Sequence, residues 1–410
     1  MKKFIIHPFL FAMFPVLFLF AKNTNIVYFS ETLGISSVVI LAAACLFLVL
    51  STIFGDRKKA GILTSLIIVL FFSYGHFHAS MWQIGAFVIT RHRYLLPLWA
   101  ALFAVEIYFV RKIKSSDNLE NLTSMLNAIA ILLVGIQIFS IVFYRQKNPN
   151  ITLPSVDSEN LAAASAAKDR DLPDIYYIIP DAYANSAVLE GFYGYDNKDF
   201  TSYLAKKGFQ VVGESRSNYP RTNLSIPATL NMEYLDQLPG ILGADSINYL
   251  PLRQVIAKNK AVRLLKAAGY KYIHLSTGYV VYEDVNKDEA DYIFRGSPFK
   301  DFTRMLVMTT VLQPLLGKLP YTEALGALPY SDRQVDFAVL EKLKEVPDMN
   351  IGGPKFTLAH IMLPHPPFIF GPNGESISVG EEAPDFEGRK KYYKEQVVYT
   401  NKLLRETIES

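Results

Sequence analysis

The chain has 410 residues, of which half are hydrophobic and only 19% are charged, and its mean hydropathy is +0.18. This composition is too apolar for an ordinary soluble enzyme of this size and predicts a membrane part. The net charge of +3 is small, and no basic patch with interleaved aromatic residues indicates a nucleic-acid partner. The one cysteine, Cys45, lies in an apolar run, so neither a disulfide within the chain nor a cysteine metal site is expected.

Five apolar stretches near the N-terminus have about the length of membrane spans, which need roughly 20 residues. They are Ile5–Phe20, Ser36–Phe54, Gly61–Ser80, Leu95–Val110 and Met125–Tyr144. Two lysines precede the first stretch, as in a signal peptide, but no small-residue cleavage site follows it. We therefore predict an uncleaved first helix and a five-helix transmembrane domain over residues 1–144, embedded in the lipid bilayer.

Basic residues near the span ends predict the orientation. Lys2 and Lys3, the run Arg57–Lys59 and the group Arg111–Lys114 all fall inside if the N-terminus is cytoplasmic, whereas Arg91–Arg93 falls outside and disagrees. With five spans, everything after the fifth lies outside. The prediction is a multi-pass protein of the cytoplasmic (inner) membrane with an extracytoplasmic C-terminal domain. Merging or dropping one span would instead put that domain in the cytoplasm.

Residues 145–170 are polar and small and are typical of a linker, and residues 171–410 alternate between β-rich and helical runs. The expected elements are a strand at 174–181, a helix and strand within 199–212, the same pair within 252–276, a strand at 355–363 and a closing helix at 390–409. This alternation predicts an α/β domain with a largely parallel sheet. Ligands in such sheets bind beyond the carboxyl ends of the strands.

Asp181 directly follows the first expected strand. A carboxylate at that position can bind a hard or borderline cation through oxygen. The alternative is a turn residue, or the N-cap of the helical segment that follows.

Thr222 opens the segment TNLSIP (222–227) before a helical run. A hydroxyl at a helix start lies at the positive end of the helix dipole, which suits a phosphate or a developing oxyanion. It becomes a nucleophile only when a base or a metal lowers its pKa. The alternative is that Thr222 or Ser225 simply caps the helix, which contributes about 1 kcal/mol.

Three histidines lie in or after the β-rich runs. In HIMLPHPPFIF (360–370) two prolines follow His365 and hold it in a defined loop, where it can bind a metal or donate to a substrate oxyanion. His360 and His274 lie inside apolar strands, and we interpret them as core histidines with their hydrogen bonds satisfied.

In this arrangement the chain resembles the membrane-anchored, sulfatase-like branch of the alkaline phosphatase superfamily, which includes lipoteichoic acid synthase and the lipid A phosphoethanolamine transferases. PDIYYIIPDAYA (173–184) resembles the family's first strand with its metal-binding acid, at Asp181. TNLSIP resembles the pattern Thr-x-x-Ser-x-Pro, whose leading threonine is the nucleophile and a metal ligand, at Thr222. HIMLPHPPF (360–368) resembles the segment whose histidine contacts the transferred group or a second metal, at His365.

The resemblance implies an alkaline phosphatase/sulfatase-like fold and a divalent metal, which is zinc, manganese, magnesium or calcium. It also implies a membrane lipid or an envelope glycan as the substrate, at the outer face of the membrane. True sulfatases have an arginine after the Pro-x of their Cys/Ser-x-Pro-x-Arg motif, and here Pro227 and Ala228 are followed by Thr229. Phosphate esters are therefore expected rather than sulfate esters.

One feature of the family pattern is missing from these 410 residues. The family completes its metal site with an Asp-His pair on a strand after the helix that matches 390–409, and the sequence contains no Asp-His dipeptide. A C-terminally incomplete sheet is therefore expected, either in a truncated copy or in an inactive relative that has lost the metal. Two hypotheses follow: a metal-dependent hydrolase or transferase with Thr222 as the nucleophile, or a non-catalytic membrane protein that binds an envelope glycan or a partner.

Overall fold

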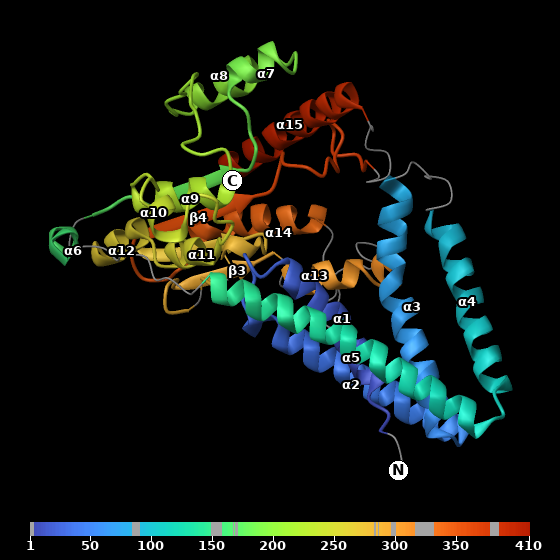
Figure 1. Cartoon of the computed structure of the whole chain (residues 1–410). Helices are drawn as coiled ribbons and strands as arrows, with labels where there is room; N and C mark the ends of the chain where they lie inside the picture. Colours follow the sequence, from blue (N-terminus) through green and yellow to red (C-terminus); the bar gives the residue numbers. More distant parts are fainter. Residues whose placement is uncertain are drawn as a thin grey trace. The chain divides into compact units, whose positions relative to one another are not determined.

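The computed structural model describes residues 4–83, 91–148, 158–166, 168, 171–282, 284, 285, 287–296, 301–315, 332–377 and 385–410 (Figure 1). The chain forms two compact units. The first, here called the membrane unit, comprises Met1–Ile151 and Phe299–Pro320. The second, here called the α/β unit, comprises Thr152–Pro298 and Tyr321–Ser410.

The described residues of the membrane unit form helices joined by short connections. Its helices are α1 (His7–Lys22), α2 (Phe29–Phe54), α3 (Arg57–Gln83), α4 (His92–Lys112), α5 (Ser116–Lys147), α13 (Asp301–Met308) and the short 3-10 helix η2 (Gln313–Leu315). Four of these, α2 to α5, are long and apolar enough to cross a membrane, which confirms four of the predicted spans. Helix α1 is apolar but has only 16 residues, which is shorter than the roughly 20 that a bilayer core requires.

The large apolar side chains on the outer surfaces of these helices are exposed. Leu41 on α2, Phe109 on α4 and Phe139 on α5 are each more than half exposed, as expected of surfaces that face lipid tails. Helix α3 differs, because half of its most apolar stretch is buried, against 6% for α5. We infer that α3 is the central helix of the unit and that the other helices pack around it.

Polar side chains connect α1 to its neighbours. The Asn127 Oδ1 of α5 accepts hydrogen bonds from the N–H groups of Ile6 (3.3 Å) and His7 (3.0 Å), and its amide nitrogen donates to the carbonyl of Phe4. The buried His7 ring shares a hydrogen bond of 2.6 Å with Ser65 of α3. These contacts satisfy N–H groups that every helix start leaves without an intrahelical partner.

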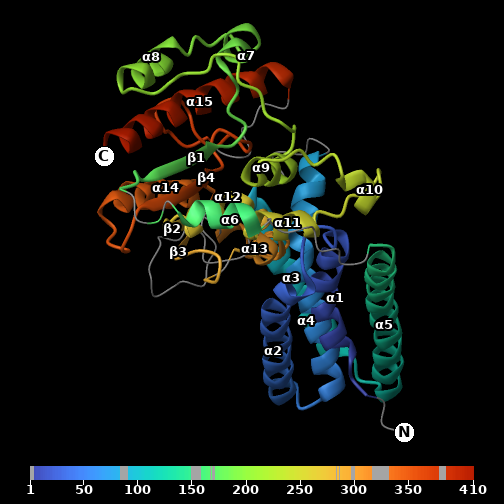
Figure 2. The same ribbon diagram turned by 90° about the vertical axis from the view of Figure 1, so that its left-hand side faces the viewer.

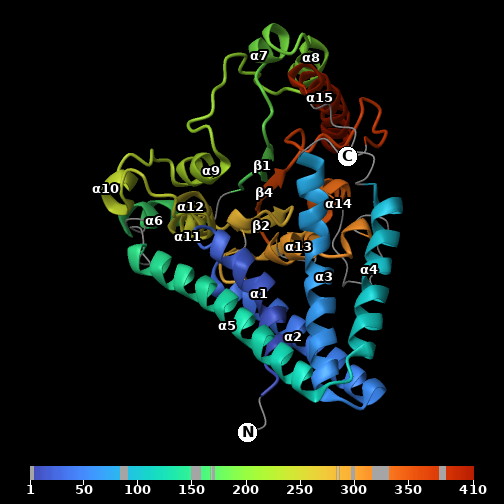
Figure 3. The same cartoon turned by 45° about the vertical axis from the view of Figure 1, so that its right-hand side comes forward.

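Residues Phe299–Pro320 follow the third strand in the sequence, yet they belong to the membrane unit. Helix α13 packs against α1 and α2 (Figures 1 and 3). Beyond it, the Gly75 N–H of α3 donates to the Thr309 carbonyl at 2.9 Å, and the Phe71 carbonyl accepts from the Val311 N–H at 3.0 Å. In an uninterrupted helix the Gly75 N–H would donate to the Phe71 carbonyl, four residues earlier. Here both groups bond to the segment after α13 instead. From the sequence alone, this segment is expected within the C-terminal domain of residues 171–410.

The α/β unit contains a four-stranded sheet in the order β1-β4-β2-β3, and each pair of neighbours is parallel (Figure 2). The strands are β1 (Ile175–Pro180), β2 (Lys271–Ser276), β3 (Tyr292–Arg295) and β4 (Lys355–Ile361). The helices are α6 (Ser158–Ser165), α7 (Ser186–Gly191), α8 (Lys198–Lys206), α9 (Thr222–Asn231), α10 (Leu238–Leu242), α11 (Leu250–Ala257), α12 (Lys260–Ala267), α14 (Asp332–Glu345) and α15 (Phe386–Glu409), with the 3-10 helices η1 (Val280–Tyr282) and η4 (Val346–Asp348). The predicted α/β class with a parallel sheet is confirmed for the described residues.

Two details of the prediction were wrong. No strand forms after Gly208, because Phe209 and Val212 lie exposed with no strand beside them to pair with. The short strand β3 was not predicted, because four residues followed by Gly296 carry little periodicity.

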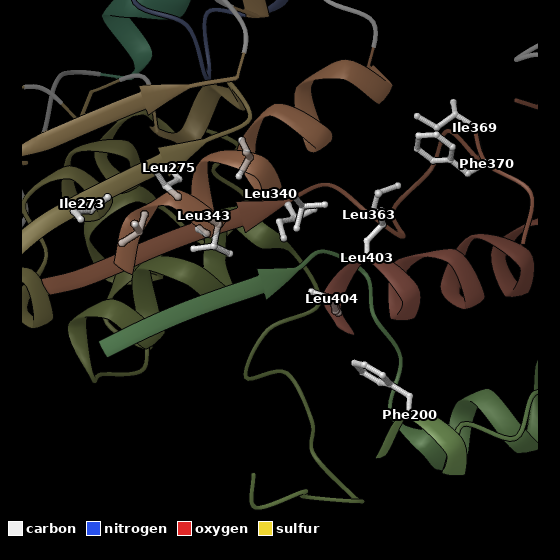
Figure 4. Packing of buried hydrophobic residues seen from close by; sticks show 14 residues of the cluster. Phe200, Ile273, Leu275, Leu340, Leu343, Leu363, Ile369, Phe370, Leu403 and Leu404 are labelled. Carbon is white, nitrogen blue, oxygen red and sulfur yellow. The ribbon is translucent and has the colours of Figure 1, made fainter. Parts of the chain in front are cut away.

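The two faces of the sheet differ in chemistry, because successive side chains of a strand point to opposite sides. One face is apolar: Ile273 and Leu275 of β2 and Ile361 of β4 pack against leucines of α14 and α15 (Figure 4). The other face carries Tyr272, His274 and His360, which are all fully buried. This polar and aromatic face leads to the carboxyl end of the sheet, where the candidate site lies.

Candidate active site

Asp181 and Thr222 meet at the carboxyl end of the sheet, although 41 positions separate them in the sequence. Asp181 follows β1 directly, and Thr222 is the first residue of α9. The Thr222 Oγ1 lies 3.3 Å from one carboxylate oxygen of Asp181 and 3.4 Å from the other, and it donates a hydrogen bond to this carboxylate. Two of the three residues selected from the sequence are therefore in contact.

The turn that carries Asp181 is held from several sides. The Asp181 N–H donates to the carbonyl of Ile361 at 2.8 Å, which ties the turn to the end of β4. The next residue, Ala182, has a φ of 58°, and its N–H donates to the Asp181 carboxylate at 3.0 Å. A left-handed conformation at a residue with a Cβ costs about 1 kcal/mol or more. Tyr393 of α15 supports it by donating its hydroxyl to the Ala182 carbonyl at 2.8 Å.

Thr222 does not cap its helix. The N-cap residue of α9 is Arg221, and no side chain accepts a hydrogen bond at this cap. The Thr222 hydroxyl turns to Asp181 instead, and the Ser225 hydroxyl donates to Asn218 at 2.5 Å. The capping interpretation is therefore wrong for both residues. The Thr222 hydroxyl lies in the first turn of a ten-residue helix, at the positive end of its dipole.

His360 lies behind Asp181 on the middle strand β4. Its side chain is fully buried, and its Nε2 lies 3.8 Å from the Oδ2 of Asp181. Neither ring nitrogen has a hydrogen-bond partner, so the residue is a core histidine, as predicted, but not a satisfied one. Burial lowers the pKa of His360 to about 4, against the opposing effect of the Asp181 carboxylate, and the ring is neutral at physiological pH.

An aromatic layer continues from His360 across the buried face of the sheet. The ring of Tyr282 lies 5.4 Å from the ring of His360 and 5.1 Å from that of His274. The Nδ1 of His274 shares a hydrogen bond of 3.0 Å with the Tyr272 hydroxyl, while its Nε2 has no partner. The prediction of a satisfied core histidine is therefore only half right for His274.

We expect His274 to make the unfolding free energy depend on pH. Burial lowers the pKa of His274 from 6.5 to about 3, and the positive charge of Arg295 adds to this effect. Between these two pH values the histidine is protonated in the unfolded chain and neutral in the folded chain. The stability contribution is present above pH 6.5 and is lost as the pH falls towards 3, which amounts to about 2 kcal/mol at pH 5. Urea unfolding of the full chain in detergent at pH 7.5 and pH 5 measures it. From pH 7.5 to pH 5 the unfolding free energy of His274→Gln should fall by about 2 kcal/mol less than that of the wild type. An identical pH dependence in both proteins would contradict the expectation.

His365, the third residue selected from the sequence, lies in the loop after β4 and is exposed. Its ring Nδ1 contacts the carbonyl of Pro366 at 2.5 Å, and its N–H donates to the carbonyl of Met362. Among the described residues no hydrogen bond or ion pair joins it to Asp181 or Thr222.

Gln396 of α15 holds the loop that carries His365, and sequence reasoning missed it. Its buried amide oxygen accepts from the N–H groups of Ile369 (2.8 Å) and Phe370 (3.2 Å), and its nitrogen donates to the carbonyls of Pro364 and His365, both at 3.1 Å. A single glutamine inside a helical run gives no sequence signal of its own. Only the fold shows that four backbone groups of a distant loop converge on it.

Replacement of Gln396 by leucine should loosen this loop. It removes four buried hydrogen bonds, each of which contributes about 1 kcal/mol, and it leaves backbone groups unpaired. We expect local opening to become easier by about 3 kcal/mol, so that the amides of Ile369 and Phe370 exchange about a hundredfold faster. Hydrogen exchange followed by mass spectrometry measures this. The control is Lys402→Leu at an exposed position of the same helix, and equal exchange in both variants would count against the assignment.

The donor set at Asp181 fits a divalent cation. Donor atoms that share a tetrahedral ion at bond lengths of 2.0–2.2 Å lie about 3.3–3.5 Å apart, and the Thr222 hydroxyl lies 3.3 and 3.4 Å from the Asp181 oxygens. Within the described part of the chain, no group of three or more His, Cys, Asp or Glu side chains is arranged to hold a metal ion. Asp181 and His360 are two such residues close to each other, and the Thr222 hydroxyl contacts Asp181.

One hollow among the described residues belongs to the membrane unit. It measures about 610 Å³ and lies at the connection of α4 to α5, between residues that include Lys112, Asn118 and Met125. None of the site residues lines it. We therefore assign the site from side-chain geometry and not from a cavity.

Comparisons with protein-family models, with curated proteins and with solved structures found no match to this chain. The resemblance to the sulfatase-like membrane enzymes consequently rests on the motifs at Asp181, Thr222 and His365 and stays a prediction.

Proposed function

We propose that this chain is a membrane-bound hydrolase or transferase that acts on phosphate esters, with Thr222 as its nucleophile. The observation that carries the proposal is the contact between the Thr222 hydroxyl and the Asp181 carboxylate at 3.3 and 3.4 Å. It brings a hydroxyl, a carboxylate and a helix N-terminus together beyond the carboxyl ends of a parallel sheet. Both residues were selected from motifs that resemble the alkaline phosphatase superfamily, and the proposed fold is of that type.

The proposed reaction has two steps. In the first, the Thr222 Oγ1–P bond forms as the bond from phosphorus to the leaving alcohol breaks, and the hydroxyl proton of Thr222 ends on that alcohol. In the second, water or an acceptor hydroxyl attacks the phosphorus, and its proton returns to Thr222 as the Oγ1–P bond breaks. The first turn of α9 offers backbone N–H groups and a positive dipole end to the phosphoryl oxygens.

Asp181 and Thr222 are the residues that would hold a divalent cation, and a bound cation would lower the pKa of the Thr222 hydroxyl. Asp181 holds the hydroxyl in place, since the turn that carries this carboxylate is bonded to both β4 and α15. His365 is the proposed contact for the transferred group. Its exposure and its loop, which Gln396 fixes, suit a residue that meets a substrate arriving from solvent.

The proposed substrates are lipids or envelope glycans at the outer face of the cytoplasmic membrane. The four membrane-length helices keep the chain in the bilayer, where a lipid donor is concentrated. The extracytoplasmic placement of the α/β unit requires a fifth crossing, for which we propose the apolar helix α1, and the basic residues near the span ends favour this orientation.

The direct experiment is an ester-hydrolysis assay on the purified full chain in detergent. We expect hydrolysis of a chromogenic phosphodiester that depends on added zinc or manganese, stops with chelator and is much slower with the matching sulfate ester. Hydrolysis of the sulfate ester alone would overturn the phosphate assignment. Absence of hydrolysis of either ester with every metal tried would favour the binding-protein hypothesis.

A further inference from the structure

His360 is a buried side chain for which the fold provides no hydrogen bond. It is fully buried, and both ring nitrogens are without a hydrogen-bond partner. Buried polar atoms in native proteins are nearly always paired, and each exception calls for an explanation. The Asp181 carboxylate faces the imidazole, with its Oδ2 3.8 Å from the His360 Nε2. An imidazole that faces a carboxylate without a hydrogen bond between them leaves a position at which both side chains could bind the same cation.

We infer that the His360 Nε2 is the third protein ligand of a divalent-cation site formed with Asp181 and Thr222. This assignment rests on the proposed function, and it names a ligand that the sequence motifs did not select. The site would have a carboxylate, a hydroxyl and an imidazole as donors. Oxygen and nitrogen donors of this kind suit zinc, and three protein ligands leave a fourth position open for a substrate oxygen.

The spacing of the donor atoms supports the assignment. The Thr222 Oγ1 and the Asp181 oxygens are separated by 3.3 and 3.4 Å, and the His360 Nε2 lies a few tenths of an ångström further from Asp181, at 3.8 Å. Ligands bound at 2.0–2.2 Å around a tetrahedral ion lie about 3.3–3.5 Å apart. The spacings of Asp181 to Thr222 and of Asp181 to His360 are thus both within about half an ångström of this range.

The fold also fixes the position of His360. It pairs with Ile179 of β1 on one side and with Ser276 of β2 on the other, so its backbone lies in the middle of the sheet. The Tyr282 ring packs edge-on against the imidazole. Asp181 is bonded through its N–H to the residue that follows His360, because its partner is the carbonyl of Ile361. The two proposed ligands therefore lie on neighbouring backbone segments that are hydrogen-bonded to each other, which gives the rigid support that a metal site requires.

His274 is a matched control for His360. It lies on the neighbouring strand, is equally buried, contacts the same Tyr282 ring and also has an unpartnered Nε2. Among the described residues, however, no ion pair joins it to Asp181. A histidine that matters only for packing should behave like His274, whereas a metal ligand should differ from it.

The test is zinc binding by the full chain, purified in detergent, stripped with chelator and reloaded with zinc alone. X-ray absorption at the zinc edge should show one imidazole in the wild type and in His274→Gln, and none in His360→Gln. Competition with a chelating dye should give a zinc Kd at least tenfold weaker for His360→Gln and within twofold of the wild type for His274→Gln. An unchanged Kd in His360→Gln, or no imidazole in the wild type, would overturn the inference.

His365→Gln separates the two neighbouring histidines. Loss of the imidazole signal in this variant, with the signal kept in His360→Gln, would assign the ligand to His365 and overturn the inference. If His360→Gln fails to fold, one imidazole that persists in both His274→Gln and His365→Gln supports His360. If zinc binding depends on His360 but the protein has no esterase activity, the site is upheld and the proposed function is overturned. If the protein is active but His360→Gln binds zinc unchanged, the proposed function is upheld and the site is overturned.

Discussion

Replacement of Thr222 by alanine should abolish phosphodiester hydrolysis, with a fall in kcat of at least about a thousandfold. The change removes the atom that attacks phosphorus, and no neighbouring hydroxyl takes its place. Ser225, one helical turn further on, donates its hydroxyl to Asn218 and not to Asp181. Thr222→Ser keeps the nucleophilic oxygen and should retain measurable activity. Steady-state kinetics with a chromogenic phosphodiester, at saturating metal, give the comparison.

Ser225→Ala is the matched control for this prediction. It removes one hydroxyl from the same short helix, so its effect on folding resembles that of Thr222→Ala, but its kcat should stay within about threefold of the wild type. A phosphorylated Thr222 peptide, trapped by acid quench and detected by mass spectrometry, would support the covalent step independently. Equal losses of activity in the two alanine variants would indicate a structural effect of α9. Full activity in Thr222→Ala would remove Thr222 from the mechanism.

The sequence was a good guide where one local signal decides the structure. Long apolar runs predicted five membrane spans, of which four are membrane-length helices, and alternating β-rich and helical runs predicted the parallel sheet. For Asp181 and Thr222, position alone left a turn residue or a helix cap as alternatives, and the motifs that resemble the sulfatase-like family selected both residues. The spans and the strands needed only composition and periodicity.

Sequence reasoning failed where two distant segments decide the outcome together. His360 and His274 have the same local signal, a histidine in an apolar strand, and only the pairing of β1 with β4 brings one of them to Asp181. Gln396 lies in a helix with many polar residues, and its four bonds depend on where the loop after β4 folds. The strand expected after Gly208 has the right residue types but no partner strand. Local sequence carries none of this information.

The docking of residues 309–311 onto α3 is the clearest case of such a long-range contact, and Gly75 should be essential to it. A Cβ added at Gly75 would lie 2.0 Å from the Met308 carbonyl oxygen and 2.6 Å from the Thr309 Cα, both backbone atoms that cannot move aside without undoing the contact. We expect Gly75→Ala to destabilise the membrane unit by about 2 kcal/mol or more, with a fall in Tm of about 5 °C.

Gly135→Ala supplies a control with the opposite expected sign. Gly135 also lies inside a membrane-length helix, α5, but a Cβ there meets nothing within 4 Å. Because glycine costs a helix interior about 1 kcal/mol relative to alanine, this variant should be as stable as the wild type or slightly more so. Thermal unfolding of the detergent-solubilised chain measures both, and hydrogen exchange at the amides of residue 75 and Val311, which donate across the contact, locates the change. A Gly75→Ala protein that melts like Gly135→Ala, with protected amides at these residues, would show that this contact does not hold the segment to α3.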